Sequence, residues 1–303
     1  MFKVFFSVMA LTVSLASSVA AQDRVTLGWG RMFTNDVFGD GKDRWKTGSY
    51  TVSRIRGASW DGTLPDAPGA LLEFRLRAET IAPADLVTPD PTDRRYAGAI
   101  SAGIHSHFMW SGFETSLGMD LVVIGPQTGL GRFQTSVHDL IGLPKPTVLG
   151  DQIEDQIRPT LVAEMGRTLS LGDRARMRPF IEAQAGAENF VRLGGDLTFG
   201  HFGQGALMLR DHASGQRYSA VSGDKIKGFS FVVGGDFAQV YSSVYLPDGG
   251  AVEMSDTRTR LRAGVHWQQE KAELFYGVTY LGKEFETQPE GQVVGSLSLK
   301  MRF

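Results

Sequence analysis

Residues 258–267 read RTRLRAGVHW, and in this stretch charged or polar side chains alternate with apolar ones. Successive side chains of a β-strand point to opposite sides, so Leu261, Ala263, Val265 and Trp267 share one face. The pattern therefore predicts a strand with one apolar and one polar face. The polar face carries Arg258, Arg260, Arg262 and His266.

The same alternation recurs along the chain. About twelve segments show it, and their length of about ten residues matches the roughly 9–11 residues of a tilted strand that crosses a membrane. No linker, longer repeat or change of composition divides them, so one closed barrel without unpaired edges accounts for all of them. The segments lie near residues 24–33, 46–57, 70–80, 96–109, 113–124, 157–169, 175–188, 191–208, 228–240, 257–268, 271–283 and 292–303.

The first residues have the composition of a secretory signal peptide. Lys3 supplies a positive start, residues 4–16 form an apolar run, and small residues follow it. That run is too short for a membrane-spanning helix. We expect residues 1–21 to form the signal peptide, with cleavage after Ala20 or Ala21, and residues 22–303 to form the barrel.

Three observations favour a membrane barrel: the predicted export signal, the length of the strands and the aromatic residues at their ends. Such a barrel exposes its apolar face to lipid and keeps a polar lumen. The last segment ends on the aromatic Phe303, the signal that the barrel assembly machinery is expected to read. The sequence thus predicts an all-β, antiparallel, twelve-stranded transmembrane β-barrel in the bacterial outer membrane. The chain has no cysteine, which excludes disulfides and thiolate sites, and its net charge of −2 gives no electrostatic case for nucleic-acid binding.

A periplasmic amino terminus places the connections after odd-numbered strands outside the cell. The first and third of these loops then share one rim, although they are far apart in sequence. Inside the barrel, we expect the arginines to pair with acidic residues, and His105 and His107 to pack near the periplasmic end. The predicted outer loops are 34–45, 81–95, 125–156, a short one near 189, 241–256 and 284–291. The predicted periplasmic turns are 58–69, 110–112, 170–174, 209–227 and 269–270.

Three short motifs fall in the first three outer loops. The first loop carries Asn35-Asp36, then Asp43-Arg44, and Thr47 follows. The second ends in DRRYAG at residues 93–98, and the third contains IGP at 124–126 and QTSVHDLIG at 134–142. Together, and in this order, these elements resemble the lipid A 3′-O-deacylase family of outer-membrane enzymes.

The resemblance implies a site made of Asn35, Asp36, Thr47, Gln134 and His138. It implies that His138 activates a water molecule and that Asp36 is a calcium ligand. The implied reaction is the calcium-dependent hydrolysis of the ester-linked acyloxyacyl chain at the 3′ position of lipid A, in the lipopolysaccharide of the outer leaflet.

The residue types suit this chemistry. Histidine is the usual general base near neutral pH, and a carboxylate such as Asp36 is a natural ligand for a hard cation. Gln134 precedes His138 by four residues, so both project from one face of a helix. Two positions depart from the family pattern: Lys46 stands where an aromatic residue is usual, and Pro144 stands where some members have an acidic residue.

Two other functions fit the same residues. An outer-membrane phospholipase would use the same histidine and calcium chemistry on a different ester. A porin-like or catalytically silent structural barrel would use none of it. No G-x-S-x-G sequence occurs in the chain, which disfavours an α/β-hydrolase.

Overall fold

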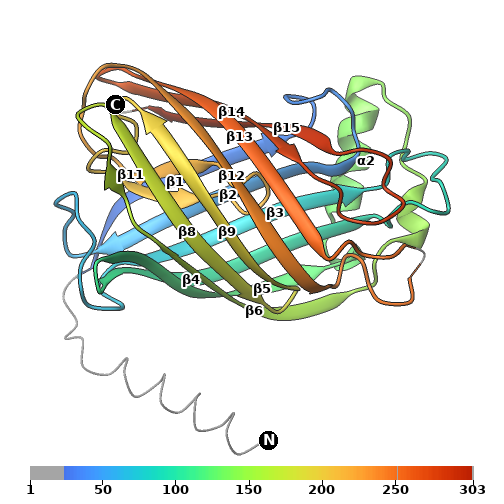
Figure 1. Cartoon of the computed structure of the whole chain (residues 1–303). Coiled ribbons are helices and arrows are strands. Elements are labelled where there is room, and N and C mark those ends of the chain that lie inside the picture. Colours follow the sequence, from blue (N-terminus) through green and yellow to red (C-terminus); the bar gives the residue numbers. More distant parts are fainter. Residues whose placement is uncertain (1–23, 251, 302–303) are drawn as a thin grey trace, which may run out of the picture.

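The computed structural model describes residues 24–250 and 252–301, and in this part of the chain twelve antiparallel strands form a closed barrel (Figure 1). Neighbours in sequence pair with each other, and β1 also pairs with β15, with Phe33 opposite Leu297, which closes the barrel. The strands are β1 (Val25–Asn35), β2 (Trp45–Gly57), β3 (Leu72–Ala82), β4 (Ala97–Trp110), β5 (Phe113–Ile124), β6 (Gln156–Gly166), β8 (Ala175–Ala185), β9 (Glu188–Phe199), β12 (Gly228–Ser243), β13 (Thr257–Gln268), β14 (Ala272–Leu281) and β15 (Gln292–Met301).

The predicted fold is confirmed, and eleven of the expected segments match a barrel strand to within a few residues. The two-residue strand β7 (Leu169–Ser170) only extends the sheet beside β8. The expected signal peptide, residues 1–21, lies outside the described residues, as does Phe303. Recognition of that terminus by the assembly machinery stays a prediction.

The two barrel ends differ in their connections. The end where β1 begins and β15 ends has mostly short turns, whereas the opposite end carries longer loops, including the one of residues 125–155. Outer-membrane barrels keep short turns in the periplasm and longer loops outside. The long-loop end is therefore the extracellular end, and the first and third outer loops share its rim as expected.

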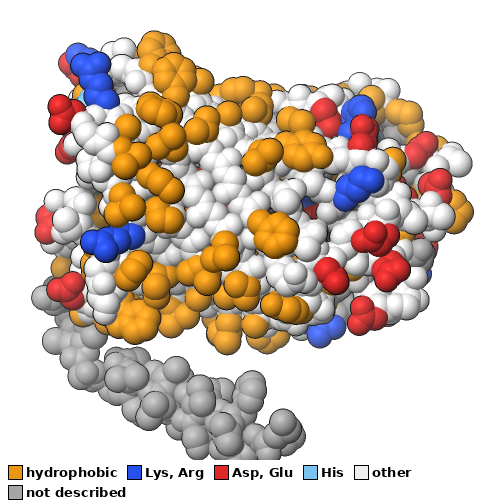
Figure 2. Space-filling model, viewed as in Figure 1, with side chains coloured by type: hydrophobic (Ala, Val, Ile, Leu, Met, Phe, Trp, Pro, Cys, Tyr) orange, Lys and Arg blue, Asp and Glu red, His pale blue; other side chains and the backbone are white. Residues whose placement is uncertain are grey.

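Exposure follows the predicted alternation. On β13, Leu261 is 63% exposed on the outer face, whereas Arg262 on the inner face is 4% exposed. Figure 2 shows hydrophobic side chains spread over the barrel wall, with charged ones gathered towards its ends. Among the described residues, no helix combines the length and apolar character needed to cross a membrane.

Charged side chains fill the lumen as ion pairs. Arg262 lies 2.7 Å from Asp196, and Arg258 lies 2.8 Å from Glu188. Removing one partner of such a pair leaves a buried charge uncompensated, which costs about 3–5 kcal/mol. The two predicted lumenal histidines are also paired, His105 at 3.1 Å from Asp120 and His107 at 2.8 Å from Glu73.

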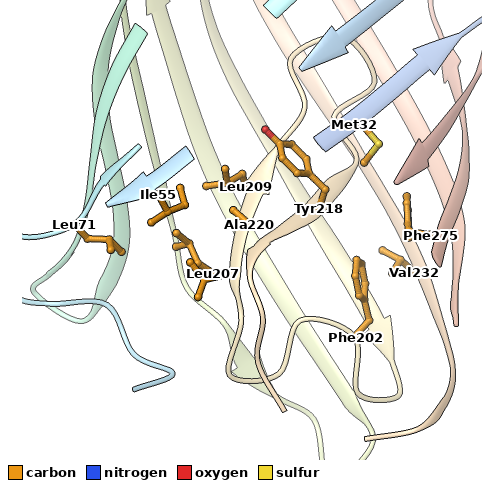
Figure 3. Packing of buried hydrophobic residues seen from close by; sticks show 11 residues of the cluster. Met32, Ile55, Leu71, Phe202, Leu207, Leu209, Tyr218, Ala220, Val232 and Phe275 are labelled. Atoms are coloured by element: carbon orange, nitrogen blue, oxygen red, sulfur yellow. The ribbon is translucent and has the colours of Figure 1, made fainter. Parts of the chain in front are cut away.

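One sequence expectation is wrong. Residues 191–208 do not form one strand, and 209–227 do not form a simple periplasmic turn: β9 ends at Phe199, and the hairpin of β10 (Leu207–Arg210) and β11 (Arg217–Val221) folds back into the lumen. Residues 207–209 read Leu-Met-Leu, a short apolar run that suits a wall strand and a strand packed inside the barrel equally well. The hairpin packs against inward-facing side chains of the wall (Figure 3).

Two wall glycines make room for this lumenal hairpin (residues 207–221). A Cβ atom at Gly28 would lie 2.3 Å from the backbone oxygen of Ala220, and one at Gly30 would lie 2.7 Å from the ring of Tyr218. Tyr218 is fully buried, and its hydroxyl lies 3.0 Å from the Ser53 hydroxyl. The hairpin therefore touches the wall closely and blocks much of the lumen.

We expect Gly28→Val to displace the lumenal hairpin, because the added side chain overlaps the backbone of β11. Overpacking of this kind costs about 1–3 kcal/mol. Ion conductance in planar bilayers should rise, and the urea midpoint of unfolding should fall. Gly195→Val is the control, since the nearest atom to its Cβ lies at an ordinary 3.8 Å. Equal conductance of folded wild type and Gly28→Val would contradict the plug role of the hairpin.

Candidate active site on the outer wall of the barrel

Strand register places small and polar residues in one row at the extracellular rim. Away from the rim, the outer face of β1 to β4 carries exposed apolar side chains such as Phe33, Leu76 and Ile104. At the rim, the same face presents residues that lipid would not favour. Across the four strands, Asn35 pairs with Gly48, Gly48 with Thr80, and Thr80 with Gly98.

A β-bulge in β2 sets the position of Thr47. Pairing with β3 jumps from Lys46↔Ile81 to Gly48↔Thr80, so Thr47 is the extra residue. Bulges bend a strand and redirect its side chains, and they are frequent beside active sites. Lys46, on the lumenal side of the bulge, donates a 2.9 Å hydrogen bond to Glu79 and does not take part in the site.

The third outer loop folds over this row. It contains the short 3₁₀ turn η1 (Pro126–Thr128), the helix α2 (Leu130–Ile141) and the 3₁₀ turn η2 (Val148–Asp151). A Cβ atom at Gly98 would lie 2.7 Å from Thr128 Oγ1 and 3.0 Å from Leu130 Cβ. Because Gly98 faces outward, the start of α2 must lie against the outside of the wall, where Figure 1 shows the helix beside the extracellular end.

Helix α2 is inverted relative to an ordinary surface helix. A surface helix usually buries its apolar stripe and exposes its polar face. In α2 the buried residues are Gln134 and His138, whereas Phe133 is 66% exposed and Leu140 is 84% exposed. The predicted spacing therefore places Gln134 and His138 on one face, and that face is turned away from solvent.

Two contacts hold the His138 ring. Its Nδ1 lies 2.8 Å from the carbonyl oxygen of Pro144, and since a carbonyl only accepts, Nδ1 carries the proton. Nε2 lies 3.1 Å from Asp43 Oδ2. Pro144 thus fixes the tautomer through its backbone, and Nε2 is the nitrogen that can take up a proton.

Asp43 is the residue that the sequence reasoning missed. It lies in the first outer loop, and its contact with His138 joins that loop to α2. The signal was present, because Asp43-Arg44 belongs to the motif by which the first loop resembles the deacylases. Burial, together with the charge of Asp43, raises the pKa of the Tyr96 hydroxyl to about 12, so Tyr96 of the DRRYAG motif also lies near this contact.

Asn35 has a structural role in the loop. Its amide donates a 2.8 Å hydrogen bond to the carbonyl oxygen of Thr47, and its Oδ1 accepts one from the backbone N–H of Val37. These bonds occupy one amide hydrogen and the amide oxygen. Asn35 therefore ties the start of the loop to β2, and its second amide hydrogen is left to meet a ligand.

Asp36 is fully buried, and only one of its oxygens is used. Oδ2 accepts a 2.9 Å hydrogen bond from the backbone N–H of Arg44, whereas Oδ1 has no hydrogen-bond partner among the described residues. Burial raises the pKa of Asp36 to about 8, with a further contribution from the charge of Asp43; the Arg44 hydrogen bond opposes this rise. An orphaned carboxylate oxygen of this kind is suited to a cation.

Other buried oxygens at the site are also without hydrogen-bond partners among the described residues. They belong to Thr47 and Gln134. Hydroxyl and amide oxygens complement a carboxylate in calcium sites, which take 6–8 oxygen ligands. The described residues contain no cluster of three or more His, Asp or Glu side chains placed to hold a metal. Asp36 Oδ1 is thus the one buried carboxylate oxygen without a hydrogen-bond partner in the described part of the chain, and a carboxylate oxygen suits a hard cation.

The comparisons place the chain among outer-membrane proteins. Residues 4–303 match the family model described as "Outer membrane protein LpxR". The solved structure of LpxR from Salmonella typhimurium superposes with a TM-score of 0.76 at 18% identity, covering 91% of this chain and 100% of that one. The NanC porin matches with a TM-score of 0.42 at 5% identity, covering 91% and 100% of the two chains. A search of curated proteins found no match.

The family match spans nearly the whole chain, and the solved LpxR structure has the same barrel architecture. The family resemblance drawn from the loop motifs is confirmed, as is the location in the bacterial outer membrane. This protein belongs to the LpxR family of outer-membrane proteins.

Proposed function

We propose that this protein hydrolyses the ester-linked acyloxyacyl chain at the 3′ position of lipid A, with His138 as the general base. One observation carries the proposal: α2 begins against the outward-facing Gly98 and turns His138 away from solvent, onto Asp43 of the first loop. An ester in the outer leaflet reaches such a site laterally, without entering the lumen. The exposed apolar stripe of α2 suits a helix whose outer side meets acyl chains.

The contacts of His138 suit base catalysis. With Nδ1–H donated to Pro144, Nε2 is the nitrogen that takes the proton from water as the water oxygen bonds to the acyl carbon. Its 3.1 Å contact with Asp43 Oδ2 is that of the protonated ring, so the attacking water takes the place of this contact when Nε2 is neutral. The carboxylate of Asp43 then faces the imidazolium that forms. The same proton passes to the leaving oxygen when the ester C–O bond breaks, which restores neutral His138.

The other residues position the reactants. Gln134 lies one helical turn before His138, and its buried Oε1 can accept a hydrogen bond from the attacking water. Asn35 holds the first loop against β2. We infer that Asp36, Thr47 and nearby backbone oxygens hold calcium. Calcium, when bound, polarises the ester carbonyl and stabilises the oxyanion.

A phospholipase would use the same groups, and the test below separates the two substrates. The porin alternative has less support, because the lumenal hairpin and the ion pairs occupy the lumen.

We expect His138→Ala to lower the rate of lipid A deacylation by about 10²–10⁴-fold, since no other group at the site replaces the base. Mass spectrometry of lipid A from cells expressing the protein should show loss of one 3′ acyloxyacyl chain, and this loss should vanish in the variant. His201→Ala, which changes a histidine in a periplasmic turn, should behave as wild type. Hydrolysed phospholipids beside intact lipid A would instead establish the phospholipase.

We expect Asp36→Asn to remove a dependence of stability on pH. The folded-state pKa of Asp36 is about 8, above the value of 3.8 of the free side chain, so its contribution to stability is complete below pH 4 and is lost as pH rises through 8. In EDTA, the urea midpoint of wild type should therefore fall over this range relative to that of Asp36→Asn. Calcium at pH 8 should stabilise wild type only, since an amide is the weaker ligand.

Asp66→Asn, at an exposed periplasmic turn, is the matched control for Asp36→Asn. It should follow wild type both in EDTA and in calcium. Equal stabilisation of wild type and Asp36→Asn by calcium would remove Asp36 from the metal site.

We expect Gly98→Val to lift α2 from the wall, because its side chain overlaps Thr128 and Leu130. Deacylation should fall at least tenfold, and trypsin should cleave faster after Arg132. Ala102→Val, on the same outer face of β4 but away from the helix, should change neither readout. Wild-type activity in Gly98→Val would show that the fit between helix and wall is not required.

A further inference from the structure

Trp45, the first residue of β2, has a backbone conformation that is rare for a large side chain. Its φ of 49° lies in the left-handed region, which a bulky residue adopts only under constraint. Among the residues that the structure describes, Ser111 is the one other non-glycine residue with a positive φ, and it lies in the tight turn between β4 and β5, where such angles are usual. Trp45 begins a strand instead, so its surroundings must hold this conformation.

The side chain of Gln292 brackets Trp45 through the two peptide groups that flank it. Its Oε1 accepts a 3.0 Å hydrogen bond from the backbone N–H of Lys46, and its Nε2 donates to the carbonyl oxygen of Arg44. Gln292 is the first residue of β15 and is only 2% exposed, so both bonds are shielded from water. An amide side chain carries the donor and the acceptor of a peptide group, and here it takes the place of a neighbouring strand.

The start of β15 also holds the other leg of the first loop, through its backbone. The N–H of Asp40 donates a 3.0 Å hydrogen bond to the carbonyl oxygen of Val293, and the N–H of Val293 donates to Asp40 Oδ2 at 3.2 Å. The first loop therefore leaves β1 along the start of β15 and returns to β2 past the side chain of Gln292. Both legs depend on the same two residues of β15.

The residues just before Trp45 make the contacts of the first loop at the candidate site. Asp43 Oδ2 lies 3.1 Å from His138 Nε2, and the N–H of Arg44 donates to Asp36 Oδ2 at 2.9 Å. A rotation about φ of Trp45 turns the preceding peptides relative to β2. Relaxation of Trp45 towards the extended region, which bulky residues prefer, would therefore move Asp43 away from His138.

We propose that Gln292 is a positioning residue of the active site, which holds Trp45 in the left-handed conformation and thereby keeps Asp43 against His138. The inference rests on the proposed hydrolysis, because it assigns Gln292 a role in the rate of that reaction. Within the described part of the chain, the side-chain hydrogen bonds of Gln292 all go to the backbone of Arg44 and Lys46. Gln292 thus acts on His138 through the chain and not by contact.

The test is steady-state hydrolysis of purified lipid A in mixed micelles by the full-length folded barrel, with unheated migration on gels to verify folding. Gln292→Met keeps the length of the side chain and removes its hydrogen bonds. We expect kcat to fall at least tenfold while KM stays within twofold, because Gln292 is buried and does not meet lipid. Gln216→Met is the control, since Gln216 is also fully buried and donates to the carbonyl oxygens of Ala263 and Val278 in the wall. It should leave both constants unchanged.

A double variant separates positioning from a general loosening of the barrel. Asp43→Asn already weakens the contact with His138, so beside it Gln292→Met should lower kcat by threefold at most. The same fold loss in both backgrounds, or a wild-type kcat in folded Gln292→Met, would overturn the proposal.

Proteolysis reports the position of the first loop without reference to activity. Trypsin should cleave after Arg44 faster in Gln292→Met than in wild type or Gln216→Met, since Arg44 is buried in the intact protein. An inactive wild type with faster cleavage in Gln292→Met would refute the proposed function and support the hold of Gln292 on the loop. An active wild type with unchanged cleavage in Gln292→Met would refute that hold alone.

Discussion

Closure of the barrel by pairing of β1 with β15 is the constraint on which the rest of the structure depends. In a membrane, each backbone N–H and C=O must find a partner within the protein, and a closed sheet satisfies this without an edge. In a closed barrel, successive side chains of each strand face lipid and lumen in turn, so apolar residues alternate with polar ones. The charged lumen would be open to water, and the lumenal hairpin fills much of that space with its own packed residues.

The candidate active site is a local exception to this sorting. At the extracellular rim the outer face of four strands carries small or polar residues, and α2 covers them with Gln134 and His138 turned inward. Polar side chains are thereby buried beside the outer face of the wall, where the proposed hydrolysis of a membrane ester requires them. The ion-paired lumen lies on the other face of the same sheet.

The strands could be predicted because alternation reports directly on the two faces of a barrel wall. The shared rim of the first and third outer loops could be predicted, since the order of the strands alone places Asp36 and His138 at the same end of the barrel. The hairpin could not, because the apolar run Leu207-Met208-Leu209 fits a strand of the wall as well as a strand packed inside the barrel. Asp43 was missed although it belongs to the motif of the first loop, because its partner His138 lies 95 positions away in sequence and the motif does not name the contact.

Pro144 departs from the family pattern, yet its backbone contacts the His138 ring. An acidic side chain at this position could hold a histidine ring by accepting from one nitrogen. Proline lacks such a side chain, but its carbonyl oxygen accepts from Nδ1 of His138 at 2.8 Å and leaves Nε2 facing Asp43. Gly142 sustains this arrangement: its positive φ of 76° ends α2 and turns the chain back so that residue 144 reaches the ring. The tautomer of His138 is thus set by the backbone at Pro144, and the negative charge beside the ring comes from Asp43 of the first loop.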